Sequence, residues 1–357
     1  MKLSKKQQEV VESKYSTTIV MSSAASGKTA VLTERARRIL ENGIDPKKLV
    51  LITFTNNAAE EMRKRLGEKA KESYIGTIHG FANYILLYNG INTYQYIQAG
   101  KFDELFEAVK KVEYIPEFEH LLLDEAQDTD DIQWEFILKL IKPKNLFVVG
   151  DIKQEIYSFN GKDTTMFKQL YMLKDSKIFH LNENYRNGEA ILQYASNLMY
   201  TKMPYEYHDN SICCSNRKGR VYKMSLDYDN ISNIIKKTDN YKDWFILTRS
   251  NAQLDEIKSN LEKRNIPCVT FRQADLSNSE LSKVMDSNTV KILTIHSSKG
   301  LEAKNVMVYG ALYYNKSEVC TTYVAMTRAM DRLYMLTAPK HGEVSKSKVK
   351  TNIVNWE

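Results

Sequence analysis

The sequence predicts an α/β protein with two successive parallel sheets, each flanked by helices. Three observations lead to this class. Short runs rich in Val, Ile and Leu alternate with helical stretches along nearly the whole chain. One such run, residues 121–123, ends in the adjacent carboxylates Asp124 and Glu125. A candidate phosphate loop, residues 22–29, stands between an apolar strand at 17–21 and a helical stretch.

Asp124 and Glu125 fall where a buried parallel strand ends, and in open α/β sheets that end faces the ligand crevice. An acid in this place can hold Mg²⁺, preferably through water, and a second acid can take a proton from an attacking water. The alternative is that the two acids simply open a helix, since Asp and Glu suit first turns.

The phosphate loop reads SSAASGKT from Ser22 to Thr29. Lys28 would reach the β- and γ-phosphates, Thr29 would bind Mg²⁺, and backbone N–H groups would cradle the anion. Ser22 stands in place of the first glycine of the usual pattern, and the loop is poor in glycine, which limits left-handed backbone angles. The alternative is an ordinary helix cap at Ser26.

Composition is that of a globular protein with a net charge of +7, which permits a polyanionic partner without requiring one. The four cysteines form no C-x-x-C pair, so neither a zinc site nor a disulfide framework is indicated and reduced thiols are expected. The first residues contain no apolar signal region, and no stretch reaches the length of a membrane span. We therefore expect a cytoplasmic protein with no membrane partner.

Further elements of the first half follow the same alternation. Asn56 is expected to cap the helix at 58–66, and His79 lies at a strand-to-helix junction, where a capping or packing role is the simpler interpretation. Residues 89–116 are irregular apart from a helix at 103–111 and are interpreted as a small insertion. The remaining strands of this half are predicted at 49–54, 74–77, 145–149 and 177–181.

A long helix is expected to open at about Tyr185, and the polar, Pro-containing stretch 201–217 is the best candidate for a linker. We place the first domain at 1–183, the second at 184–340 and a loosely ordered basic tail at 341–357. Strands of the second domain are predicted at 219–226, 243–249, 267–271, 289–295, 304–310 and 332–337.

Several segments together resemble the motif series of the UvrD/Rep/PcrA helicases, superfamily one, type A. They are LSKKQ, SSAASGKT, TFTNNAAEEM, GTIHGFANYIL, DEAQD, VVGDIKQEIYSFNG, NYR, TIHSSKGLE and YVAMTRA. They occur in family order from Leu3 to Leu336, and independent chance matches would not keep that order. The resemblance implies two tandem RecA-like domains of the P-loop NTPase type.

For the nucleotide, the resemblance implies that Gln7 reads the adenine, Tyr185 stacks on it and Glu302 meets the ribose. Lys28 and Thr29 would hold phosphate and Mg²⁺ within the loop, Asp124 would support Mg²⁺ and Glu125 would activate water. Gln154 would sense the γ-phosphate, and Arg186 and Arg328 would be arginine fingers, a role that suits a planar, permanently charged side chain. The expected loop residues are Ser23, Ala24, Ala25, Ser26, Gly27, Lys28 and Thr29.

For a nucleic-acid strand, the family implies aromatic platforms and polar contacts. Phe54, Tyr157 and Phe159 match the platform positions. The matching polar positions are Thr55, Thr77, His79 and His296. Because Tyr and Phe are abundant in this chain, any other aromatic residue is assigned to the core by default.

The chain also departs from the family pattern. Asn160 stands where arginine is usual, which questions the coupling between DNA contact and hydrolysis, and residues 319–321 replace a basic stretch. Residues 89–116 and the segment between Arg186 and Thr294 leave little room for the accessory subdomains, usually called 1B and 2B. A minimal core is therefore expected, with 89–116 as the remnant of 1B.

The resemblance implies an ATP-dependent translocase or helicase on single-stranded DNA, moving 3′ to 5′ and hydrolysing ATP between its domains. We expect a monomer in a bacterial cell or phage-infected host, with a protein partner possible in place of the missing subdomains. The rival is a nucleotide-gated DNA-binding subunit of a nuclease or replication complex, with weak ATPase activity. A third alternative is a degenerate structural paralogue, although no expected catalytic group is missing.

Overall fold

The computed structural model describes residues 3–156, 166–238, 240–272, 275–337 and 352–353. The chain divides into two units. The first contains Met1–Ser22, Ser26–Ile152 and Tyr157–Leu181, and the second contains the short pieces Ser23–Ala25 and Lys153–Ile156 together with Asn182–Glu357.

The first unit is built on a six-stranded parallel sheet with the order β3-β2-β4-β5-β1-β6. Alternate strand residues point to opposite faces, and both faces are apolar, as in parallel sheets covered on both sides. The strands are β1 (Thr17–Ser22), β2 (Leu49–Ile52), β3 (Tyr74–Gly76), β4 (His120–Leu123), β5 (Asn145–Gly150) and β6 (Ser176–Leu181).

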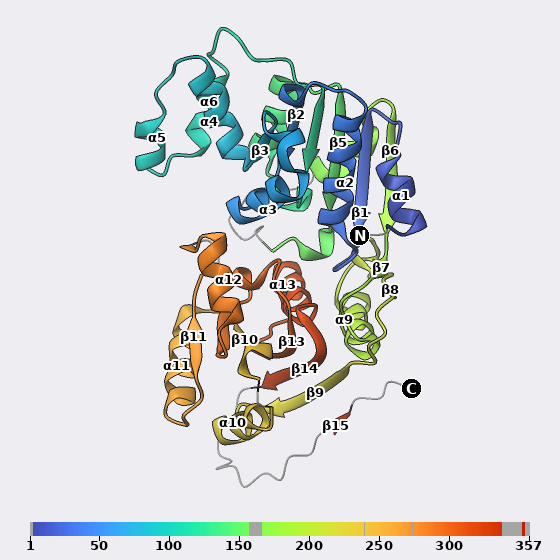
Figure 1. The fold of residues 1–357 in the computed structure, drawn as a ribbon. Coiled ribbons are helices and arrows are strands. Elements are labelled where there is room, and N and C mark those ends of the chain that lie inside the picture. The colour runs from blue at the N-terminus through green and yellow to red at the C-terminus, as the bar shows by residue number, and fades with distance from the viewer. Residues whose placement is uncertain (1–2, 157–165, 239, 273–274, 338–351, 354–357) are drawn as a thin grey trace. The chain divides into compact units, whose positions relative to one another are not determined.

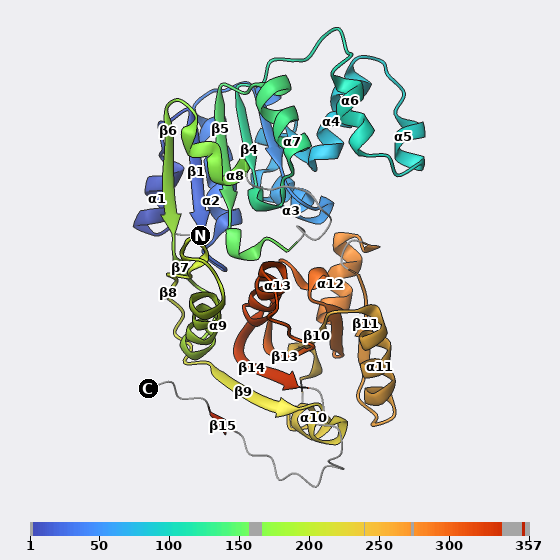
Figure 2. The same ribbon diagram turned by 180° about the vertical axis from the view of Figure 1, so that it is seen from behind.

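Helices α1, α2 and α3 pack their buried residues against one face of this sheet, and α7 and α8 lie on the other (Figures 1 and 2). A π-helical turn, Phe136–Ile141, continues α7. The helices are α1 (Lys5–Val11), α2 (Lys28–Glu41), α3 (Asn56–Leu66), α4 (Ile78–Tyr88), α5 (Tyr94–Gln98), α6 (Asp103–Val109), α7 (Asp131–Glu135) and α8 (Met166–Gln169).

The second unit contains a sheet with the order β11-β12-β10-β13-β14-β9-β15, parallel except for β15. The small pair β7–β8 precedes it. The strands are β7 (Glu183–Asn184), β8 (Ile212–Cys213), β9 (Arg220–Ser225), β10 (Trp244–Thr248), β11 (Cys268–Thr270), β12 (Val290–Thr294), β13 (Ala303–Tyr309), β14 (Ala329–Thr337) and β15 (Asn352–Ile353).

Helices α10 and α11 bury apolar residues against one face of the second sheet. Helices α9 and α13 lie against each other and against the strands β9, β13 and β14. The helices of this unit are α9 (Glu189–Lys202), α10 (Tyr228–Lys236), α11 (Asn251–Glu262), α12 (Asn278–Asp286) and α13 (Lys316–Met326). The predicted class, two parallel-sheet α/β domains flanked by helices, is confirmed.

Three local predictions were wrong. Helix α3 is capped by Thr55, whose hydroxyl accepts from the Ala58 N–H at 3.2 Å, and Asn56 is its first residue. Helix α9 begins at Glu189, well after Tyr185, because Asn184 Oδ1 accepts from the N–H groups of Arg186 and Asn187 and holds that stretch in a turn. The stretch 201–217 does not link the two units, since it lies within the second unit and contains β8 and the buried residues Tyr207 and Asp209.

Candidate active site

The phosphate loop follows β1 and ends at Gly27, which has φ 81° and precedes the first residue of α2, Lys28. A Cβ added at Gly27 would lie 2.6 Å from Gln7 Nε2. That amide donates to the Ser26 carbonyl at 2.9 Å, and Gln7 is 2% exposed. Only glycine suits this position, because a side chain would meet both a left-handed backbone and the Gln7 amide.

The rest of the loop takes its shape without glycine. Ala25 has φ 55°, in the left-handed region that non-glycine residues rarely adopt. The Ser26 hydroxyl is buried and has no hydrogen-bond partner among the described residues. A buried, unsatisfied hydroxyl beside a helix N-terminus fits a site that receives an anion from outside the protein.

Lys28 Nζ lies 3.3 Å from the Glu125 carboxylate, so the loop and the end of β4 meet within the first unit. Glu125 has φ 51°, and its backbone N–H donates to the Asp124 carboxylate at 2.9 Å. Asp124 is 8% exposed. The expected phosphate-binding cation and the expected base are therefore in direct contact.

Gln127 belongs to this group although it was not predicted. Its Nε2 donates to Glu125 at 2.6 Å, and its Oε1 accepts from the Asp151 N–H at 2.8 Å. Gln127 is 1% exposed, so it fixes the Glu125 carboxylate relative to the end of β5. Its place two residues after Glu125 in DEAQD was the available sequence signal.

Thr29 and Asp124 offer only oxygen atoms, the donor type that Mg²⁺ prefers. Within the part of the chain that the structure describes, no group of three or more His, Cys, Asp or Glu side chains could hold a metal ion. Thr29 and Asp124 would supply oxygen ligands to a bound Mg²⁺, an ion that commonly takes further ligands from water and substrate phosphates.

In the second unit, Gln154 and Arg328 are in direct contact. Arg328 Nη2 lies 3.2 Å from Gln154 Oε1, and Arg328 Nη1 donates to the Leu301 carbonyl at 3.3 Å. Arg328 is 2% exposed and Gln154 is 3% exposed. A buried guanidinium held by an amide and carbonyl groups keeps its charge and its planar fork in one orientation.

Arg186 lies near the same turn. It forms an ion pair with Glu302, and its Nη1 donates to the Thr327 carbonyl at 3.4 Å. Asn187, which was not predicted, donates to the same carbonyl at 3.0 Å. The structure therefore brings Gln154, Arg186, Glu302 and Arg328 together around the Thr327 turn of one unit.

The backbone carbonyls of Ala24 and Ala25 accept hydrogen bonds from the NYR stretch, residues 184–186. Asn184 Nδ2 donates to the Ala24 carbonyl at 2.9 Å, and the Tyr185 N–H donates to the Ala25 carbonyl at 3.1 Å. Tyr185 is 38% exposed, which leaves ring surface on which a base could stack. Its hydroxyl donates to Glu183 at 2.8 Å.

Four of the residues predicted to contact DNA follow two neighbouring strands of the first sheet. Phe54 and Thr55 come after β2, and Thr77 and His79 come after β3. Phe54 is 44% exposed, as a stacking platform requires. The Thr77 hydroxyl caps α4 by accepting from Gly80, so the hydroxyls of Thr55 and Thr77 both already accept a backbone N–H group.

His79 and His296 are held differently. His79 Nε2 lies 3.5 Å from the Asp103 carboxylate of α6. His296 makes a hydrogen bond with the Ile156 carbonyl at 3.3 Å, and burial lowers its pKa. The predicted platforms Tyr157 and Phe159, and the unusual Asn160, lie outside the described residues.

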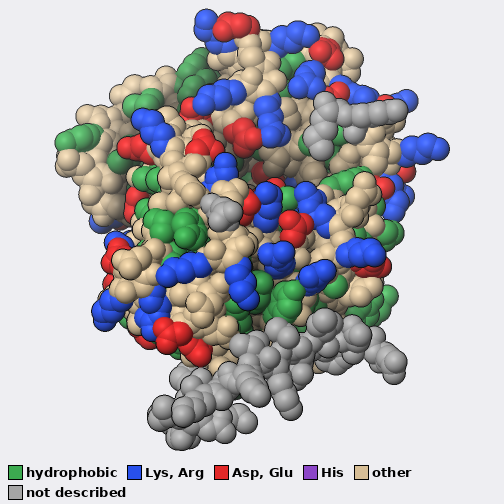
Figure 3. Space-filling model, turned by 60° about the horizontal axis from the view of Figure 1, so that its bottom comes forward, with side chains coloured by type: hydrophobic (Ala, Val, Ile, Leu, Met, Phe, Trp, Pro, Cys, Tyr) green, Lys and Arg blue, Asp and Glu red, His purple; other side chains and the backbone are tan. Residues whose placement is uncertain are grey.

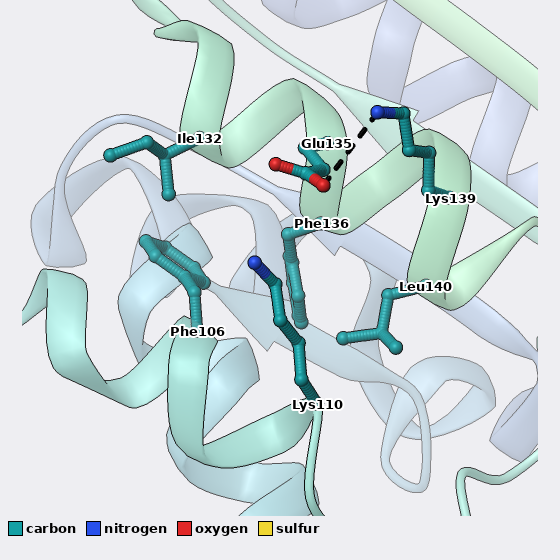
Figure 4. Close-up of a pocket in the computed structure, with 7 residues that line it drawn as sticks. All are labelled: Phe106, Lys110, Ile132, Glu135, Phe136, Lys139 and Leu140. Carbon is teal, nitrogen blue, oxygen red and sulfur yellow. Dashed lines mark ion pairs between the residues drawn. The ribbon is translucent and has the colours of Figure 1, made fainter.

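A separate cavity of about 170 Å³ lies where α6 meets α7 and its π-helical continuation (Figure 4). Its walls include Phe106, Ile132 and Phe136, and an ion pair between Lys139 and Glu135 spans 3.6 Å at its rim. Ligand pockets usually measure roughly 300 to 1,000 Å³, so this cavity is too small for a nucleotide.

Comparison with protein-family models identifies both units. The UvrD/REP helicase N-terminal domain matches residues 3–112 and 99–174, and the UvrD-like helicase C-terminal domain matches 179–276 and 270–340. The chain belongs to the UvrD/Rep helicase family. Together the two models cover nearly all of the described chain, in the order that the motifs predicted.

Individual relatives in the UvrD/Rep family are distant. The ATP-dependent DNA helicase PcrA of Leuconostoc citreum is 27% identical over 371 residues, which cover 74% of this chain and 49% of the relative. A probable DNA helicase of Mycoplasma pneumoniae is 24% identical, covering 94% of this chain and 83% of the relative. The PcrA of Staphylococcus aureus is 27% identical, and the alignment covers 73% of this chain and 50% of the relative.

The chain spans about half the length of the PcrA relatives that it matches. The Leuconostoc alignment is 371 residues long, longer than this chain, yet covers only 74% of it, so the relative carries internal segments that this chain lacks.

Among the helices of the described residues, none combines the length and the apolar character of a membrane span, and α2 and α9 have 14 residues each.

Proposed function

We propose that this member of the UvrD/Rep family is an ATP-dependent translocase and helicase that acts on single-stranded DNA. The observation that carries the proposal is that two complementary sets of groups are each assembled within their own unit. The first unit holds Lys28, Thr29, Asp124 and Glu125, and the second holds Gln154, Arg186 and Arg328. Hydrolysis of ATP is expected to use both sets.

In this proposal Glu125, oriented by Gln127, accepts a proton from the attacking water. The water oxygen forms a bond to the γ-phosphorus as the bond to the β–γ bridging oxygen breaks, giving ADP and phosphate. Lys28, Arg186 and Arg328 stabilise the negative charge on the phosphoryl oxygens. Bound Mg²⁺, held through Thr29 and Asp124, would neutralise charge on the β- and γ-phosphates.

Gln7 and Tyr185 are proposed to bind the adenine, and Glu302 the ribose. For the DNA strand, Phe54 and His79 would lie at the end of the first sheet formed by β2 and β3, next to the β4 end that carries Asp124. We propose 3′-to-5′ movement by one chain, a direction that follows from the family resemblance.

Steady-state ATP hydrolysis, measured with and without oligonucleotide, tests this function. We expect Mg²⁺-dependent turnover that single-stranded DNA stimulates and that rising salt weakens, with little preference for sequence. Lys28→Ala and Glu125→Gln are the matched inactive variants. Turnover unchanged by saturating oligonucleotide would contradict the motor.

A nucleotide-gated DNA-binding subunit with slow hydrolysis is the second candidate. The glycine-poor loop favours it, because Ala25 sits at φ 55°, where a non-glycine backbone is strained. Tight ATP-dependent DNA binding combined with turnover that DNA does not raise would support this candidate over the motor.

A further inference from the structure

The segment between α9 and β9 contains a buried carboxylate that lies in none of the recognised motifs. Asp209 is 2% exposed. Its Oδ2 accepts from the Tyr323 hydroxyl at 2.8 Å and from the Ser196 hydroxyl at 3.1 Å. Its Oδ1 accepts from Ser211 and, at 3.4 Å, from Ser23, and lies 3.8 Å from Lys153 Nζ.

Three of these partners belong to segments that carry the proposed active site. Ser23 lies in the phosphate loop, Lys153 directly precedes Gln154, and Tyr323 lies in α13, which ends just before Arg328. All of them fall within the second unit. One buried carboxylate therefore contacts the segments expected to bind phosphate, to sense the γ-phosphate and to carry a finger.

The residue on the other side of Gln154 is anchored to the same region. Glu155 is 4% exposed, accepts from the Tyr207 hydroxyl at 3.3 Å and pairs with Lys316 Nζ at 3.0 Å. Lys316 Nζ also lies 4.7 Å from the centre of the Tyr207 ring. Both neighbours of Gln154 thus contact a charged partner. Lys153 and Asp209 form a buried pair, where weak screening strengthens the contact, whereas Glu155 is buried and its partner Lys316 is partly exposed.

We propose that Asp209 is a positioning residue for ATP hydrolysis. It holds Ser23, Lys153 and α13 in the arrangement that presents Gln154 and Arg328 together to the γ-phosphate. Asp209 touches no substrate atom in this proposal, which rests on the ATPase function proposed above. The competing explanation is that Asp209 merely balances the charge of Lys153.

Asp209→Asn tests the proposal because it keeps the size of the side chain and removes its charge. We expect kcat for ATP to fall by at least tenfold, while the Kd for a fluorescent ATP analogue changes less than threefold. Backbone amide exchange should speed up within residues 23–25 and 153–156. Asp229→Asn is the control, since it breaks an exposed pair with Arg264 in the same unit, 2.7 Å apart, and should behave like wild type.

A second variant separates positioning from charge balance. Lys153→Met combined with Asp209→Asn leaves no unpaired buried charge, so the urea midpoint should recover. If Asp209 positions the site, kcat stays low in this double variant; recovery of wild-type kcat would overturn the proposal. Tyr323→Phe removes a single hydroxyl and should also lower kcat several-fold, which keeps the test decisive if Asp209→Asn does not fold.

The outcomes also separate this inference from the function on which it rests. Wild-type turnover by Asp209→Asn would overturn the positioning role alone. Failure of the wild-type protein to hydrolyse ATP, with or without DNA, would overturn the proposed function itself.

Discussion

At the scale of single residues, Arg328 is the proposed arginine finger whose guanidinium is buried and hydrogen-bonded to Gln154. We predict that Arg328→Ala lowers ATP turnover by roughly 10³- to 10⁵-fold, the usual effect of losing an arginine finger. Binding of nucleotide should change far less, since the phosphate loop is untouched. Steady-state kinetics with an equilibrium binding assay measure both quantities.

Two further variants qualify that result. Arg328→Lys keeps the charge but loses the planar fork, and we expect most of the loss to persist. Arg220→Ala, at an exposed position on β9, is the matched control. Wild-type turnover in Arg328→Ala would show that the finger is misassigned.

Lys291 is a buried residue, and its side-chain ammonium group has no role in the proposed mechanism of ATP hydrolysis. It lies on β12 at 0% exposure, and its Nζ donates to the carbonyls of Ser287 and Thr289. Burial, with a smaller contribution from Lys242, lowers its pKa to about 8. The folded protein therefore disfavours a charge that the unfolded chain carries freely up to its ordinary pKa.

This shift predicts a pH dependence of stability. Between about pH 8 and 10 the unfolded chain holds a proton on Lys291 that the folded protein has released, so the free energy of unfolding rises with pH. In Lys291→Met that rise should be smaller by roughly 1–3 kcal/mol. Urea titrations of both proteins at pH 7 and 9.5 measure the difference, and parallel profiles would contradict the shift.

At the scale of elements, the N-terminus of α4 combines a structural role with a proposed DNA contact. The Thr77 hydroxyl accepts from the Gly80 N–H at 3.2 Å. We predict that Thr77→Ala lowers the free energy of unfolding by about 1 kcal/mol, the usual cost of a lost cap. Thr77→Ser should restore it. Chemical denaturation measures the effect, and DNA affinity compared between the Ala and Ser variants shows whether the hydroxyl also serves the strand.

Elements differ in how far the sequence predicts them. The strands were found because each is a short apolar run bounded by polar residues, and β4 and β5 illustrate this most directly. The start of α9 was misplaced because its position depends on a side-chain bond from Asn184, which no periodicity reveals. The short helix α5 was missed because none of its five residues is buried, so no apolar periodicity marks it.

The candidate site also contains residues that the sequence predicted and residues that it did not. Lys28, Glu125 and Arg328 were predicted from motifs, and the structure places Lys28 beside Glu125 and Arg328 beside Gln154. Asp209 was missed because a polar stretch suggests a linker, whereas this carboxylate is buried and is satisfied by Tyr323 and Lys153, which are distant in the sequence. Sequence patterns report burial of apolar residues well, but they do not report a polar network closed through distant partners.

At the scale of the whole molecule, little chain is available for gripping duplex DNA. The segment between α4 and β4 contains only α5 and α6 as helices, and residues 203–295 build the second unit's own elements. Translocation needs the nucleotide site and a single-strand track, whereas strand separation also needs a wedge or a duplex anchor. We predict that the chain moves along single strands and displaces short duplexes poorly when alone.

Unwinding assays on 3′-tailed duplexes of increasing length measure this expectation, with ATP turnover on the same DNA as the internal control. Efficient, processive separation by the isolated chain would contradict it. The aromatic residues of α5, including Tyr94 at 62% exposure, would then be the candidate wedge. A protein partner that supplies the missing grip should raise unwinding without changing turnover in the core.

On one face of the protein, surface charge does not mark a single path for the strand (Figure 3). On the face seen in Figure 3, Lys and Arg side chains are spread with Asp and Glu side chains between them. The net charge of +7 favours long-range attraction of a polyanion. The number of phosphate contacts can be measured from how steeply the affinity for DNA falls as the salt concentration rises.

The distribution of the two short pieces, Ser23–Ala25 and Lys153–Ile156, bears on attempts to dissect the protein. The backbone changes unit at each end of both pieces, so no single cut yields two self-sufficient fragments. A fragment of residues 182–357 would keep its sheet but would lose Lys153 from the buried Asp209 carboxylate and Glu155 from the partly exposed Lys316, so a buried negative charge would lose its cationic partner. The second unit is therefore not one continuous segment of the sequence. A chimaera or split version of this chain that moves the second unit would have to include those seven residues as well.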